Sequence, residues 1–146
     1  TRRLLPDVVL SVTVPHVLPL DLQSQLALDL IDAGADLIQT EGGAISRPLS
    51  PGTLGMIEKA SPSLAATSSI FEHLRQEGIN VPLIAASGFS AVTVPMAFSV
   101  GAAGVGVGSA VNRLNDELDM VAVVKRLRGA INSSKNLLTS SNEINA

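Results

Sequence analysis

The sequence predicts an α/β fold, the C-terminal half of a (β/α)8 barrel in which parallel strands alternate with helices. Apolar strand-like segments and helical segments follow one another in the order βαβαβαβα, which is typical of parallel sheets with right-handed crossovers. The predicted strands over 81–86 and 103–107 each end in a turn of small residues that contains glycine. The last two strands of (β/α)8 barrels end in this way, and four βα units are half of such a barrel.

The first two predicted strands flank a helix. Residues 8–14 form a β-branched run between prolines, as expected for a buried strand. Asp21 is the predicted N-cap of the following helix, and Gly34 is its predicted end. The second strand covers 37–40 and leads into Glu41 and two glycines.

Two helical segments are predicted before the third strand. A short helix covers 54–59, after a loop over 44–52. A second helix begins with Ser61 as its N-cap and Pro62 in its first turn, where a missing N–H costs little. This second helix ends near Gly78, and the third strand covers 81–86.

The last two units are short. Thr93 is the predicted N-cap of a helix that starts at residue 94, so that Pro95 falls in its first turn. The fourth strand covers 103–107. Asn115 is the predicted N-cap of the final helix, whose acidic residues near the start and basic residues near the end suit the helix dipole.

The expected domain is a partial barrel over residues 1–131, followed by a polar, disordered tail over 132–146. Half a barrel leaves strand edges and an inner face uncovered. We therefore expect the chain to be a fragment of a protein of about 250 residues, or to associate as a homo-oligomer. A small doubly wound sheet is the alternative fold.

Composition excludes several classes of function. Hydrophobic residues make up 46% of the chain and aromatic residues only 2%, so the core is aliphatic, as in buried parallel sheets. The net charge is −3 and there is no Tyr or Trp, which argues against nucleic-acid binding. The absence of cysteine excludes disulfides and thiolate catalysis. Residues 80–112 carry no charge but contain prolines and glycines, so no membrane span is expected.

Five segments are similar to one family. They are LSVTVPHVLPLD (10–21), ADLIQTEGG (35–43), SPGTLGMIEKASPSLAA (50–66), AASGFSAVTVPMA (85–97) and GAAGVGVGSAVNRLNDELDM (101–120). Together they resemble the hypothetical chloroplast reading frame twenty-three (ycf) family over about residues 4–128. The resemblance implies an aldolase-type TIM barrel of the plastid stroma or the cyanobacterial cytoplasm, without an established reaction. The first four strands of that barrel are absent from this chain.

Two candidate catalytic residues follow the first two strands. His16 comes directly after the first strand and is a candidate general acid or base, or a phosphate ligand; the alternative is a turn histidine bonded to backbone. Alternation along the second strand places Gln39 and Glu41 on one face. Burial of Glu41 against an apolar barrel would raise its pKa and make it a base; the alternative is an ion pair with Arg or Lys.

Four candidate phosphate-binding residues follow the last two strands: Ser87, Gly88, Gly108 and Ser109. Their N–H groups and hydroxyls, with a short helix beginning near Ser109, would hold an anion. The alternative is tight packing that requires small residues. The segment GVGVG lies within and after a strand and lacks the G-x-G-x-x-G spacing of a dinucleotide site.

These residues predict an enzyme of the lyase, isomerase or aldolase type that acts on a phosphorylated small molecule. The alternatives are a non-catalytic metabolite-sensing or regulatory barrel and an inactive truncated fragment. No lysine lies at a strand end, so no Schiff-base lysine is expected in this half of the barrel. One His and one Glu at the mouth support no metal site, and the sequence indicates no cofactor.

Overall fold

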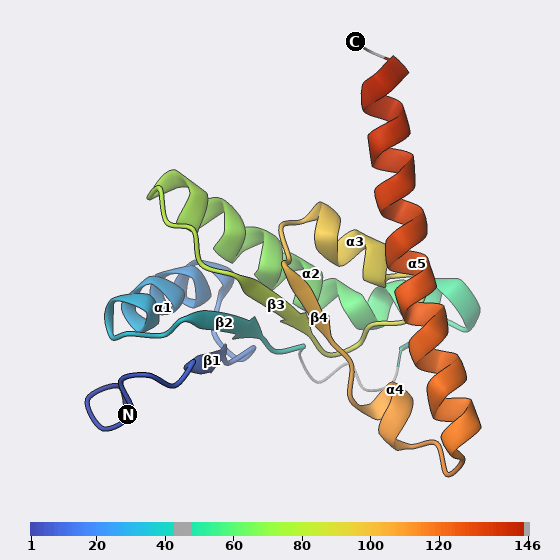
Figure 1. The fold of residues 1–146 in the computed structure, drawn as a ribbon, viewed down its shortest axis with the longest axis horizontal. Coiled ribbons are helices and arrows are strands. Elements are labelled where there is room, and N and C mark those ends of the chain that lie inside the picture. The colour runs from blue at the N-terminus through green and yellow to red at the C-terminus, as the bar shows by residue number, and fades with distance from the viewer. Residues whose placement is uncertain (43–47, 145–146) are drawn as a thin grey trace.

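A four-stranded parallel sheet forms the centre of the fold in the computed structural model, which describes residues 1–42 and 48–144. The strands lie side by side in the order in which they occur along the chain (Figure 1). This arrangement confirms the α/β class and the predicted parallel neighbours. The strands are β1 (Ser11–Val14), β2 (Leu37–Thr40), β3 (Leu83–Ala86) and β4 (Gly104–Gly106).

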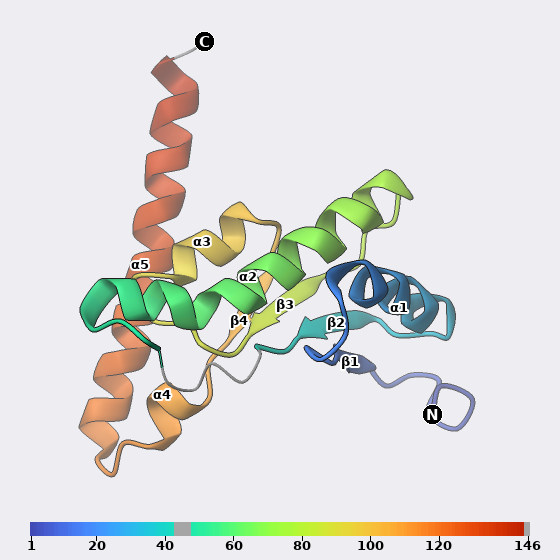
Figure 2. The same ribbon diagram turned by 180° about the vertical axis from the view of Figure 1, so that it is seen from behind.

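The helices are α1 (Leu20–Asp32), α2 (Gly52–Gln76), α3 (Val94–Ser99), α4 (Ser109–Asn112) and α5 (Glu117–Ile144). Helices α1, α2, α3 and α5 pack on one face of this sheet, whereas α4 lies beyond the end of β4 and contacts α5. Figure 2 shows α2 lying across the sheet, with α1 beside it. The opposite face has no helix on it in the described part of the chain. Its residues are mostly small or polar: Ser11, Thr13, Leu37, Gln39, Ile84, Ala86, Gly104 and Gly106.

The core lies between the sheet and the helices and, apart from Phe89, its buried hydrophobic residues are aliphatic, as the composition predicts. One cluster joins α1 and α2 to the first three strands, and Ile38, Ile70 and Leu83 are its largest fully buried side chains. Burying each of these contributes about 1.5–3 kcal/mol. A second cluster joins α2 and α3 to β3 and β4 through small residues such as Ala60 and Ala85.

Three strands are shorter than predicted. The predicted strand 8–14 begins only at Ser11. The carbonyl oxygen of Val8 is bonded to an arginine instead of to β2. The guanidinium of Arg2 donates to the carbonyl oxygens of Gly34, Pro6 and Val8, and it pairs with Asp36. The strand predicted over 81–86 begins two residues later, at Leu83. The strand predicted over 103–107 is shorter by one residue at each end.

Proline does not divide α2. The sequence predicts two helices over this region, but one helix runs from Gly52 to Gln76 with Pro62 inside it. The missing N–H of Pro62 removes a single helical bond, and the Ser61 hydroxyl donates to the Ile57 carbonyl 2.8 Å away. The prediction is wrong because the buried stripe of α2 continues across the proline, and packing outweighs local propensity. The stripe comprises Gly55, Ala60, Ser63, Ala66, Thr67, Ile70 and Leu74.

Two predicted N-caps are also wrong. Helix α1 begins after Pro19 without a side-chain cap, so Asp21 lies within its first turn. At the start of α5, the cap is Asp116 in place of Asn115, because the Asp116 carboxylate accepts the N–H of Asp119 at 3.0 Å. The predicted start of α3 after Thr93 is confirmed.

Helix α5 extends further than the sequence predicts. The backbone of 132–144 is helical and continues the element past residue 131, into the range predicted to be a disordered tail. A run of Ser, Asn, Lys and Leu contains no proline that would stop a helix. Residues 145–146, and 44–47 of the predicted loop, lie outside the described residues. Among the helices of the described ranges, none has the length and apolar character needed to cross a bilayer.

Candidate functional site

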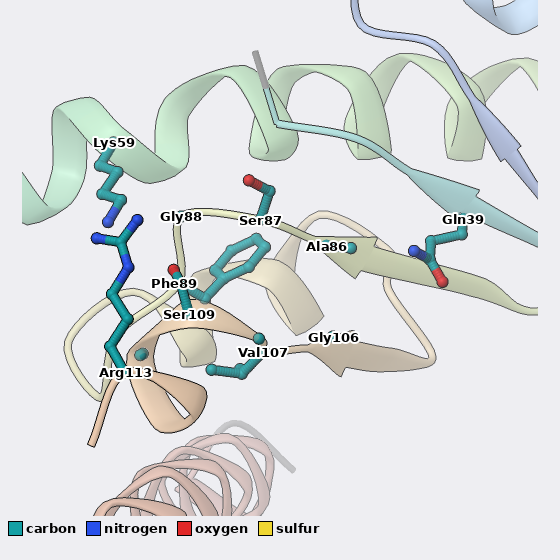
Figure 3. A pocket seen from close by; sticks show the side chains of 12 residues that line it. Gln39, Lys59, Ala86, Ser87, Gly88, Phe89, Gly106, Val107, Ser109 and Arg113 are labelled. Atoms are coloured by element: carbon teal, nitrogen blue, oxygen red, sulfur yellow. The ribbon is translucent and has the colours of Figure 1, made fainter. Parts of the chain in front are cut away.

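A pocket of about 460 Å³ opens at the carboxyl ends of β3 and β4 (Figure 3). All four candidate phosphate-binding residues line it: Ser87 and Gly88 after β3, and Gly108 and Ser109 after β4. The sequence places these residues in two separate turns. Parallel pairing of β3 with β4 brings the two turns to the same edge of the sheet.

Two basic residues of the pocket were missed by the sequence analysis. Lys59 lies on α2, and Arg113 follows the last residue of α4. Figure 3 shows their charged groups facing one another at one end of the pocket. Among the residues that the structure describes, no Asp or Glu lines this pocket and neither cation forms an ion pair. Two like charges held together repel each other, so the position favours an anion between them.

A sequence signal for Lys59 exists but is weak. A helix that follows a strand in a βα unit starts at the carboxyl edge of the sheet, and Lys59 is in the third turn of α2. Lys59 lies within a helix and not at a strand end, so the pattern of strand-end residues does not reveal it. Arg113 gave no such signal, because its position depends on the turn made by α4.

The turn that contains Ser87 is held in an unusual conformation. Ser87 has φ of 77°, in the left-handed region that non-glycine residues rarely adopt. The fully buried Ser63 hydroxyl lies 2.6 Å from the Ala86 carbonyl oxygen and 2.9 Å from that of Ser87. The buried Thr40 hydroxyl accepts the N–H of Ala86 at 3.3 Å. Polar groups of β2 and α2 therefore fix the shape of this side of the pocket.

Gly88 allows α2 to approach the turn closely. It has φ of +82°, and a Cβ at this position would lie 2.2 Å from the Lys59 carbonyl oxygen. Only glycine combines this backbone conformation with this approach. The contact also brings the Lys59 side chain to the pocket.

His16 and Glu41, predicted separately, form a pair at the carboxyl ends of β1 and β2. His16 Nδ1 lies 2.8 Å from Glu41 Oε2, and the His16 backbone N–H donates to the same oxygen at 3.2 Å. Because Nδ1 contacts the carboxylate, Nε2 is the ring nitrogen left for proton transfer. The pair lies at the same edge of the sheet as the pocket but does not line it.

The raised pKa expected for Glu41 is wrong. The His16 ring first, and then the His16 backbone N–H, hold the pKa of Glu41 below its usual range. The carboxylate is 46% exposed, so burial does not oppose ionisation strongly. Glu41 therefore orients the histidine and is a weaker base than the sequence suggested.

We expect the Glu41 carboxyl to titrate at lower pH in the native chain than in a His16→Ala variant. Hydrogen bonds to the ionised form depress the folded-state pKa. The associated stability is therefore present above the unfolded value, roughly 4.3, and is lost as the pH falls through the lower folded value. Carbon-detected NMR titration measures both midpoints. Identical midpoints in the two proteins would contradict the pairing.

Gly42 connects this pair to the pocket. A Cβ at Gly42 would lie 2.6 Å from the Ser63 hydroxyl oxygen and 2.7 Å from the Ser87 Cβ. The turn after β2 therefore packs directly on the turn after β3. The His16–Glu41 pair and the pocket are parts of one continuous edge.

Comparison with known proteins identifies relatives without an assigned activity. A family model described as a protein of unknown function (DUF561) matches residues 1–137. The uncharacterized protein ycf23 of Porphyra purpurea is 40% identical over 137 residues, which is 94% of this chain and 50% of that protein. The ycf23 protein of Cyanophora paradoxa is 41% identical over 134 residues, covering 92% and 53%. The chain spans about half the length of these curated relatives.

Proposed function

Since this chain belongs to the DUF561 family of proteins of unknown function, as the sequence resemblance predicted, we propose its function from the geometry of its site. The chain binds a phosphorylated small molecule in the pocket at the ends of β3 and β4. The observation that carries this proposal is the convergence of Lys59 and Arg113 in a pocket whose described lining residues include no carboxylate.

The surroundings of the two cations suit a phosphate group. The chain as a whole has a net charge of −3. The charged residues that line the pocket are both positive, so the pocket differs in charge from the chain as a whole. Arginine and lysine bind phosphate oxygens through charge-assisted hydrogen bonds. The hydroxyls of Ser87 and Ser109 add further donors. Helix α4 has only four residues, so the proposal rests on side-chain charge and not on a helix dipole.

We further propose that the His16–Glu41 pair supplies acid–base chemistry of the lyase, isomerase or aldolase type. Glu41 would hold the imidazole in one orientation while Nε2 takes or gives a proton. The alternative is a metabolite-sensing or regulatory protein with no turnover, or an inactive portion of one. Binding in the pocket without His16-dependent turnover of the bound compound would favour the sensor.

The architecture we propose is the C-terminal half of an aldolase-type (β/α)8 barrel. Consecutive strand order, helices on one face and an uncovered opposite face all support it. Parallel sheets are normally covered on both faces. The cover would come from the remaining half of a protein as long as the relatives, or from a second copy in a homo-oligomer. The ycf names of those relatives support a plastid stroma or, in cyanobacteria, a cytoplasmic location.

Removing either pocket cation is expected to weaken phosphate binding by roughly tenfold or more, because a hydrogen bond to a charged group contributes about 1.5–3 kcal/mol. Isothermal calorimetry with inorganic phosphate and glycerol 3-phosphate would compare the native chain with Lys59→Ala and Arg113→Ala. The matched control is Lys125→Ala, because Lys125 is exposed on α5 and does not line the pocket.

A second variant tests the same pocket by charge reversal. A Cβ at Gly108 has no atom within 4 Å, so Gly108→Asp is expected to fold and to place a carboxylate where the anion would bind. Phosphate affinity should fall below detection. Unchanged affinity in Gly108→Asp and in both cation variants, with native circular dichroism spectra, would exclude this pocket.

A further inference from the structure

Gln39 lies at the opposite end of the pocket from the two cations (Figure 3). It sits on β2 and faces the side of the sheet that has no helix, between Thr13 on β1 and Ile84 on β3. The side chain is half-buried, and within the described residues its amide forms no hydrogen bond. A polar group that has lost part of its water without a protein partner is suited to a ligand.

The floor between Gln39 and the cations is made of small residues. Ala86 and Gly106 are direct partners in the β3–β4 register, and a Cβ at Gly106 would lie 3.1 Å from the Cβ of Ala86. Ala86 and Gly106 therefore project nothing larger than a methyl group into the pocket. The pocket volume of about 460 Å³ accommodates a compound much larger than a phosphate ion.

Charge is distributed unevenly along the pocket. One end carries two cations, and the other carries a neutral amide that offers both N–H donors and a carbonyl acceptor. A hydroxyl group also donates and accepts, so it complements the amide. A second phosphate or a carboxylate at this end would lose its water without gaining a cation.

We propose that the ligand is charged at one end only: a monophosphate ester of a polyhydroxylated compound, the sugar-phosphate class, with a hydroxyl recognised by Gln39. Lys59 and Arg113 hold the phosphate, and the carbon chain lies over Ala86 and Gly106. This inference rests on the proposed phosphate site and adds the chemical class of the ligand. Gln39 is then a specificity-determining residue.

The test compares three probes by calorimetry on the full chain: inorganic phosphate, fructose 6-phosphate and fructose 1,6-bisphosphate. Native chain is expected to bind fructose 6-phosphate more tightly than the other two. Gln39→Leu should reduce this affinity by roughly three- to tenfold and leave phosphate affinity unchanged. The control is Gln25→Leu, because Gln25 is exposed on α1, where its amide contacts Asp29.

A gain-of-preference variant covers the case in which Gln39→Leu does not fold. Gln39→Lys places a third cation at the neutral end and should make fructose 1,6-bisphosphate the tightest of the three probes. If native chain binds phosphate but does not prefer fructose 6-phosphate, or Gln39→Lys leaves the order unchanged, the ligand class is wrong and the phosphate site stands. If native chain binds none of the probes, the phosphate site and the ligand class are both refuted.

Discussion

Gly88→Ala is expected to destabilise the chain by roughly 2–5 kcal/mol and to remove binding in the pocket. A left-handed backbone costs an L-residue about 1–2 kcal/mol, and forcing an extra methyl group into packed atoms costs about 1–3 kcal/mol more. The new Cβ would lie 2.2 Å from the Lys59 carbonyl oxygen, which belongs to the α2 backbone and cannot rotate away. Relief of this clash requires the turn to move off α2, which separates Lys59 from Ser87. Urea denaturation measures the loss.

Two other glycines separate the causes of this loss. Gly78 also has a positive φ, of +69°, but a Cβ there meets no atom within 4 Å, so Gly78→Ala reports backbone strain alone. Gly108 lines the same pocket as Gly88, but its φ is not positive and a Cβ there also meets no atom within 4 Å. Gly108→Ala should therefore change the free energy of unfolding very little. A Gly88→Ala variant no less stable than Gly78→Ala would show that the turn and α2 are not in contact.

Ser63→Ala is expected to cost roughly 1–3 kcal/mol, because it leaves the buried Ala86 carbonyl oxygen without this donor. The lost hydroxyl contacts the carbonyl oxygens of Ala86 and Ser87 and is fully buried. Without it, Ser87 is freer to leave the left-handed conformation, so phosphate affinity should fall together with stability.

The control for Ser63 is on the same helix. Ser61→Ala removes an exposed hydroxyl that donates to the Ile57 carbonyl within α2, and a change within about 0.5 kcal/mol is expected there. Thermal unfolding followed by circular dichroism compares the two variants. Equal effects at Ser61 and Ser63 would mean that the turn after β3 does not depend on this hydrogen bond.

Sequence reasoning predicted the strands and their order well. The segment 37–40 matches β2 residue for residue, because β-branched and aliphatic runs between glycines identify buried strands. It failed where a distant residue decides the local outcome. Arg2 holds residues 6 and 8 away from the sheet, and the sheet face under α2 keeps that helix intact across Pro62.

The candidate site was predictable in part for the same reason. Small residues that directly follow a strand can be recognised from the local sequence alone. Ser87, Gly88, Gly108 and Ser109 could therefore be predicted as site residues, although the sequence does not show that their two turns lie in one pocket. The His16–Glu41 contact depends on the register of β1 against β2, in which Thr13 is opposite Gln39. The sequence could not supply that register, and it therefore gave Glu41 the wrong direction of pKa change.

The consecutive order of the strands also bears on how the chain folds. Each strand pairs with the one that precedes it, so no pairing must wait for a distant part of the chain. Closing a connection between consecutive strands costs less entropy than closing one between strands further apart in the sequence. The sheet can therefore grow by one βα unit at a time in the direction of synthesis, and β2 and β3, bonded on both sides, are the last strands to open.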